Sequence, residues 1–91
     1  MNLTLHAQQR MQQRGISLQA VDYVLTYGRV SHDHHGGRVI WLDKRSKAQI
    51  GQAEGQRVVR ELDKHLNAYV VMDSNGSVVT VGHRYRRIMR H

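Results

Sequence analysis

The chain has 91 residues, a length that fits one domain with a single core. It contains no cysteine, which excludes disulfides, thiolate nucleophiles and Cys-ligated zinc, and no apolar run approaches the roughly 18 residues of a membrane span. Fourteen Lys and Arg residues against seven Asp and Glu residues give a formal charge of +7, which indicates a polyanionic partner. Because no secretory signal pattern is present, we expect a cytoplasmic protein that does not contact a membrane.

Two short helices are predicted at the start of the chain. Thr4 is suited to cap a helix that runs to about Gln13 and ends at Gly15. Ser17 is suited to cap a second helix that stops at Gly28. In both, apolar residues recur at the three- to four-residue spacing of a helix with one buried face, so we expect a helical hairpin.

The middle of the chain is predicted to contain a polar loop, a strand and a helical stretch. Residues 32–37 are polar and end in two glycines, which indicates a loop. The apolar run within residues 38–43 predicts the first strand. Residues 46–66 have helical periodicity, and Gly51 and Gly55 predict a loop or a break in the first half of this stretch.

A β-hairpin is predicted near the C-terminal end. Residues 68–73 form a continuous apolar run, residues 74–76 have turn chemistry, and residues 77–85 predict the returning strand. The expected fold class is therefore α+β, with two N-terminal helices packed on a small antiparallel sheet and an additional helix before the C-terminal hairpin. No proline and no linker composition interrupts the chain, so residues 1–91 are expected to form a single domain.

Basic side chains are concentrated in residues 83–91. This segment holds four arginines, two histidines and no acidic residue. If the strand continues, its alternation places His83, Tyr85 and Arg87 on one face and Arg84 and Arg86 on the other. The planar guanidinium group matches phosphate, so the segment is expected to contact nucleic acid.

The first predicted helix carries a second basic set. His6, Arg10 and Arg14 follow one another at intervals of four, so their side chains lie along one line of the helix. The two arginines fall beside the apolar stripe rather than opposite it, which leaves three alternatives. They bury their stems, pair with carboxylates such as those of Asp22, Asp43 and Asp73, or line an anion-binding groove beside the sheet.

The two basic sets together have the groups needed for RNA cleavage without a metal ion or cofactor. The ribose 2′-hydroxyl attacks the adjacent phosphorus while one group takes its proton, another protonates the leaving oxygen, and cations stabilise the phosphoryl charge. Histidine suits the proton transfers because it titrates near neutral pH. The candidate catalytic residues are His6, His83, Arg84 and Tyr85, and the candidate nucleic-acid contacts are Arg10, Arg14, Arg84, Arg86, Arg87 and Arg90.

A metal site is the competing interpretation of the histidine-rich segment. His32, Asp33, His34 and His35 have ligand types that suit zinc, nickel or copper. Neighbouring residues in a glycine-flanked loop rarely converge on one ion, so a polar loop is favoured and no metal is expected. The sequence also has no Walker motif, dinucleotide fingerprint or nucleophile elbow, which argues against nucleotide hydrolysis and acyl transfer.

Two stretches carry a resemblance to a known family. Residues 5–17 read LHAQQRMQQRGIS, and residues 78–84 read VVTVGHR. They are similar to a bacterial family of small domains, without settled function, that is grouped with the RelE/ParE-like toxins. The resemblance implies two N-terminal helices against an antiparallel sheet, and it implies roles for His6, Arg10, Arg14, His83 and Arg84. The helical stretch after the first strand departs from the compact layout of these toxins.

Three functions therefore remain as hypotheses. The first is a toxin-type endoribonuclease that acts on RNA without a metal ion. The second is a non-catalytic module that binds nucleic acid or the ribosome, and the third is an interaction protein for an acidic partner such as an antitoxin. The first requires the basic line of the first helix to meet the start of residues 83–91, because a general acid and base must reach their protons.

Overall fold

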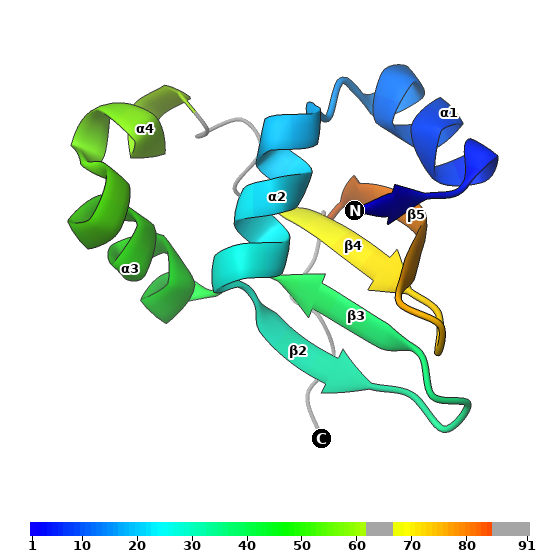
Figure 1. Cartoon of the computed structure of the whole chain (residues 1–91). Coiled ribbons are helices and arrows are strands. Elements are labelled where there is room, and N and C mark those ends of the chain that lie inside the picture. The colour runs from blue at the N-terminus through cyan, green and yellow to red at the C-terminus, as the bar shows by residue number, and fades with distance from the viewer. Residues whose placement is uncertain (62–66, 85–91) are drawn as a thin grey trace.

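The structure is a computed structural model that describes residues 1–61 and 67–84 (Figure 1). Within these ranges the elements are, in chain order, β1 (Asn2–Leu3), α1 (Leu5–Arg14), α2 (Leu18–Tyr27), β2 (Arg29–His32), β3 (Arg38–Trp41), α3 (Lys44–Glu54), α4 (Gln56–Glu61), β4 (Ala68–Met72) and β5 (Ser77–His83). The fold class is α+β, as the sequence predicts.

The strands of the described residues form one five-stranded sheet in the order β1-β5-β4-β3-β2. The strands β2, β3, β4 and β5 pair antiparallel, whereas β1 pairs parallel with β5. The sheet is therefore mixed, and the expectation of a purely antiparallel sheet is wrong at this one edge. The parallel pairing involves only two residues of β1, Asn2 opposite Ser77 and Leu3 opposite Val78.

The predicted caps of the first two helices are confirmed. The Thr4 hydroxyl accepts a hydrogen bond from the Ala7 N–H at 3.1 Å, and the Ser17 hydroxyl accepts one from the Ala20 N–H at 3.0 Å. Gly15 ends α1 with a φ of 63°, a left-handed conformation that favours glycine. These interactions are local, which is why the sequence alone places both helices correctly.

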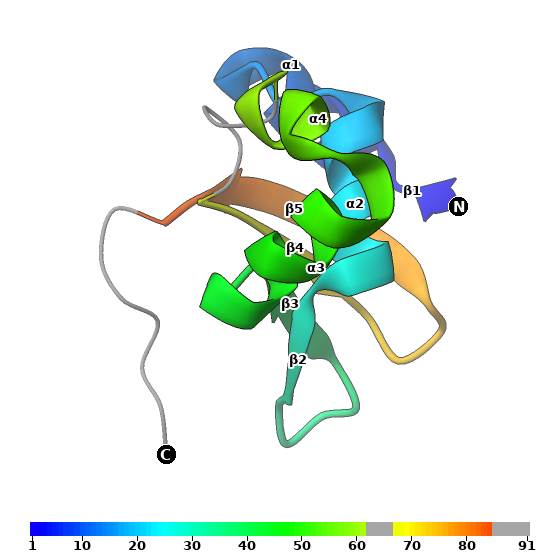
Figure 2. The same cartoon turned by 90° about the vertical axis from the view of Figure 1, so that its left-hand side faces the viewer.

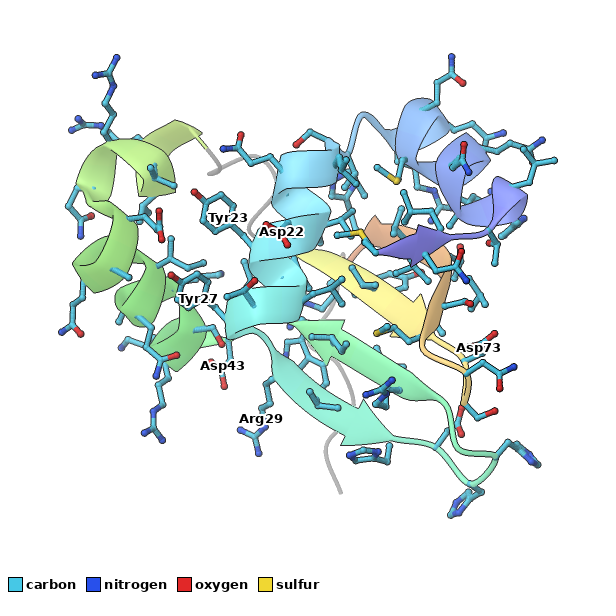
Figure 3. All side chains as sticks on the ribbon, viewed as in Figure 1. Asp22, Tyr23, Tyr27, Arg29, Asp43 and Asp73 are labelled. Carbon is cyan, nitrogen blue, oxygen red and sulfur yellow. The ribbon has the colours of Figure 1, made fainter. Side chains whose placement is uncertain are left out.

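The central helical stretch begins earlier than predicted, and up to residue 61 it consists of two helices. Residues 62–66 of the predicted stretch lie outside the described residues. Asp43 caps α3, because its side chain accepts a hydrogen bond from the Ser46 N–H at 2.8 Å. Gly51 lies inside α3, and the break predicted for this stretch falls at Gly55, where φ is 92°. Tyr27 of α2 donates a hydrogen bond to Glu54 of α3 at 3.0 Å, which holds α3 against α2 (Figure 3).

Two strands of the described residues are not predicted by the sequence, and each of the three predicted strands is shorter than expected. β1 and β2 are both missing from the sequence prediction, and His32 belongs to β2 rather than to the loop. Asp33 follows β2 and closes the turn, because its Oδ1 accepts the N–H groups of His35 and Gly37 at 2.7 Å and 2.8 Å. The predicted β4–β5 hairpin is confirmed, with β5 ending at His83.

The apolar core lies between the helices and one face of the sheet (Figure 2). Ile40, Val70 and Val81 are cross-strand neighbours on this face and are at most 4% exposed. The buried side chains that α1 and α2 pack against them include Ala7 and Val24. None of the helices in residues 1–61 and 67–84 is long and apolar enough to cross a membrane.

Ile50 tests whether α3 is an integral part of this core. Its side chain is fully buried in the core cluster, so Ile50→Ala is expected to lower the free energy of unfolding by about 2–5 kcal/mol. Leu18→Ala is the control, because Leu18 of α2 is 54% exposed and its loss should change stability by less than about 0.5 kcal/mol. Urea denaturation measures both, and equal effects would contradict the packing of α3.

Candidate nucleic-acid interface

Strand β1 pairs only with Ser77 and Val78 of β5. Helix α1 lies along the part of β5 that follows them (Figure 1). At the start of the helix, the Thr4 N–H donates to the Val78 carbonyl at 3.0 Å and the Thr4 hydroxyl donates to the Val79 carbonyl at 3.3 Å. In the last turn, Arg14 Nη1 donates to the Val81 carbonyl at 3.2 Å. The helix therefore runs in the direction of β5, and its basic line ends beside the C-terminal end of that strand.

The guanidinium group of Arg14 lies over Gly82. A Cβ atom added to Gly82 would be 2.5 Å from Arg14 Nη1 and 2.7 Å from the Tyr69 hydroxyl. The side chains of Arg14 and Tyr69 therefore lie next to each other, in the space that a side chain at position 82 would occupy. Tyr69 is the cross-strand partner of Gly82 on β4. Of the first basic set, Arg14 therefore meets β5 at Gly82, the residue before His83.

His6 and Arg10 form a separate pair on α1. Arg10 Nε donates a hydrogen bond to His6 Nε2 at 3.3 Å, and its Nη1 donates to Gln13 Oε1 at 3.3 Å. His6 is exposed and Arg10 is half-buried. Neither arginine of α1 pairs with a carboxylate within residues 1–61 and 67–84, and Arg14 instead donates to a backbone carbonyl of β5.

His83 is the last residue of β5, where it pairs with Ala68 of β4. It is half-buried, and it shares the helix-covered face of the sheet with Val81. His83 therefore continues the row of the buried Val81 to the end of β5. Arg14 and Tyr69 lie over Gly82 on the opposite face, so His83 and Arg14 flank this end of β5.

Arg84 joins the end of β5 to the end of β3. Its N–H donates to the Asn67 carbonyl at 2.7 Å, and its Nη2 donates to the Leu42 carbonyl at 3.0 Å. Its Nε is buried and has no hydrogen-bond partner among the described residues. Burial lowers the pKa of Arg84, and the nearby charge of Asp43 opposes that effect. Part of this guanidinium is therefore engaged in holding the strands together.

Asp43 is a second point where charged groups gather (Figure 3). Its Oδ1 accepts hydrogen bonds from the N–H and the hydroxyl of Ser46, both at 2.8 Å, and its Oδ2 lies 3.7 Å from Arg29 Nη1. The bonds from Ser46, and to a lesser extent Arg29, lower the pKa of the Asp43 carboxyl. A cavity of about 360 Å³ adjoins this group, and its lining includes Arg45 and Gln49.

Several predicted site residues lie outside the described part of the chain. These are Tyr85, Arg86, Arg87 and Arg90, so their proposed roles stay predictions. The segment His32, Asp33, His34 and His35 is described, and its Asp33 carboxylate accepts backbone N–H groups. Within residues 1–61 and 67–84, no three His, Cys, Asp or Glu side chains are placed to share a metal ion.

Sequence reasoning missed three residues of this region. The sequence patterns place Tyr69 only in an apolar strand and Gly82 only in the returning strand, and they place Arg29 in no helix or strand. A signal for Gly82 did exist, because a glycine inside a strand often marks a place where another group approaches the backbone closely. Tyr69 and Arg29 belong to this region because of the register between strands. The pattern of a single sequence does not predict that register.

The fold and the site define an α+β domain with helices on one face of a mixed sheet and basic side chains along its β5 edge. The model of a family described as a domain of unknown function, DUF4258, matches residues 3–83. The chain belongs to this family. No curated protein and no solved structure matches the chain.

The depressed pKa of Asp43 makes a prediction about stability at acidic pH. Because its carboxyl has a folded-state pKa below the ordinary 3.8, the ionised form stabilises the fold, and this contribution is lost as the pH falls through the folded-state value. The stability difference between the parent and Asp43→Asn should therefore be constant above about pH 5 and shrink below about pH 4. Urea denaturation at a series of pH values measures it.

Ser46→Ala is the companion variant for this measurement. It removes the hydroxyl donor to Asp43 and keeps the carboxylate, so part of the acid sensitivity should disappear. Identical pH profiles for the parent and Asp43→Asn would contradict the assigned cause.

Proposed function

We propose that this chain binds RNA, with the edge formed by α1 and β5 in contact with the phosphate backbone. The observation that carries the proposal is the position of Arg14, which brings the basic line of α1 to Gly82 at the end of β5. A formal charge of +7 with eleven arginines supports a polyanionic ligand, because the guanidinium fork matches phosphate oxygens. The ribosome is one source of such RNA.

The proposal includes a RelE/ParE-like assignment for the domain. Two N-terminal helices precede four strands that pair antiparallel, and the helices cover one face of the sheet, which supports this assignment. The helices α3 and α4 lie between β3 and β4 as an addition to that layout. A cytoplasmic location and an acidic antitoxin as protein partner belong to the same proposal and rest on composition and charge.

Salt dependence of RNA binding tests the α1–β5 edge. Arg10→Gln should weaken binding of a single-stranded RNA and reduce the slope of log affinity against log salt by about 0.7, because one phosphate contact is lost. Arg60→Gln removes the same charge from α4, which lies on the other side of α2 from α1 (Figure 1), and should change the slope much less. Fluorescence anisotropy with a labelled oligonucleotide measures both, and an affinity that does not depend on salt would overturn the proposal.

Metal-free RNA cleavage is the second candidate function. The observation in its favour is that His83, Arg14 and Tyr69 lie at the same end of β5, His83 on the helix-covered face of the sheet and the other two on the opposite face. A histidine is able to take the proton of the 2′-hydroxyl or to protonate the leaving 5′-oxygen, while arginines stabilise the charge on the phosphoryl oxygens. His6, Arg84 and Tyr85 complete the proposed catalytic set, in which a second proton-transfer group is required.

Cleavage has its own test. RNA incubated with the pure protein should be cut in the presence of EDTA, and His83→Ala should reduce the rate by about 100-fold or more, as expected for loss of a general acid or base. Circular dichroism shows whether the variant is folded. Arg84→Ala is less informative, because Arg84 also bonds the carbonyl of Leu42. Intact RNA after incubation with folded parent protein would exclude catalysis and leave RNA binding as the function.

A further inference from the structure

One row of paired residues crosses the sheet near the end where β5 finishes. The pairing places Arg29 of β2 opposite Trp41 of β3, Trp41 opposite Tyr69 of β4, and Tyr69 opposite Gly82 of β5. Directly paired residues point to the same face of a sheet, so these four share one face. Arg14 lies over Gly82 and completes the row, which we call the aromatic row: Arg29, Trp41, Tyr69, Gly82 and Arg14.

The aromatic row lies on the face of the sheet that the apolar core does not use. Ile40, Val70 and Val81 alternate with members of the row along their strands and face the helices. Trp41 is only 7% exposed, yet it does not belong to the core cluster. Tyr69 is half-buried, and it lies next to Trp41 in the row, with its hydroxyl end over Gly82.

Positive charge stands at both ends of the aromatic row. Arg14 lies at the β5 end, and Arg29, whose side chain is 63% exposed, lies at the β2 end. Arg29 is 3.7 Å from Asp43, but an exposed ion pair of this kind contributes little and leaves the guanidinium able to bind a phosphate. With strands about 4.8 Å apart, the three steps from β2 to β5 span about 14 Å.

We propose that the aromatic row is a binding site for single-stranded RNA. The phosphates of a short stretch of the strand lie at Arg29 and Arg14, and a base between them stacks on the ring of Tyr69. This inference rests on the proposed RNA binding and adds the form of RNA that is bound. A base inside an A-form duplex is stacked on its neighbours and its ring face is covered, so a tyrosine in a sheet reaches only an unpaired base.

Gly82 is the residue that makes room for this arrangement. Its backbone has no positive φ, so alanine is compatible with the conformation of the chain here. The added methyl group would nevertheless lie within 3 Å of Arg14 Nη1 and of two atoms of Tyr69. Gly82→Ala therefore displaces both groups while leaving every charge and every aromatic ring in the protein.

The experiment uses Trp41 as an internal reporter, because it is the single tryptophan of the chain. The full chain is titrated with a single-stranded uridine-rich RNA and with a duplex RNA of the same length, while Trp41 emission and anisotropy are recorded. We expect the single strand to change Trp41 emission and to bind at least about 10-fold more tightly than the duplex.

Matched variants then separate stacking from burial. Tyr69→Phe keeps the aromatic ring and should bind the single strand like the parent. Tyr69→Leu keeps an apolar side chain without a ring and should lose about 10-fold or more in affinity for the single strand, with duplex binding unchanged. Gly82→Ala should weaken single-strand binding in the same direction. Arg29→Gln should do so more than Arg60→Gln, which removes the same charge from α4.

The outcomes separate this inference from the proposed function. If the RNAs bind but Tyr69→Leu behaves like Tyr69→Phe, or the duplex binds as tightly as the single strand, the aromatic row is not the site and RNA binding by the α1–β5 edge stands. If folded parent protein binds neither RNA, the proposed function itself fails. Thermal denaturation of each variant confirms that a loss of binding occurs in a folded protein.

Discussion

The pairing of β4 with both β3 and β5 is the contact on which the rest of the structure depends. It aligns Ile40, Val70 and Val81 into one apolar row, and α1 and α2 bury their own apolar side chains against it. Because side chains alternate along a strand, this alignment also sends Trp41 and Tyr69 to the opposite face. The same strand pairing that aligns the core residues therefore also aligns the residues of the aromatic row.

The sequence predicts the elements whose signals are local. The caps at Thr4 and Ser17, the helix end at Gly15 and the β4–β5 hairpin each depend on residues within a few positions of one another. β1 and β2 were missed because their pairing partners are distant and their own patterns are weak. β1 has two residues and pairs with a strand more than 70 positions away, while β2 has one apolar residue, Val30, among four exposed positions.

The candidate site was predicted in part. Helical spacing correctly indicates that Arg14 lies beside the apolar stripe of α1 rather than opposite it. The sequence did not indicate that Tyr69 would be the neighbour of Arg14, since that depends on the register of β4 against β5 and on the missing side chain of Gly82. Nor does any periodicity predict that Arg84 donates to the carbonyl of Leu42, 42 positions earlier in the chain.

The role in binding that we propose for Arg14 is compatible with its structural contact for a physical reason. A guanidinium group has five N–H donors in a planar fork, and the bond to the Val81 carbonyl uses Nη1. That bond restricts a side chain that would otherwise lose much of its conformational freedom when a phosphate binds. An arginine held in place this way binds an anion at a smaller entropic cost than one that is free in solvent. The position of Arg14 across the end of β5 therefore supports the proposal that a phosphate binds at this edge.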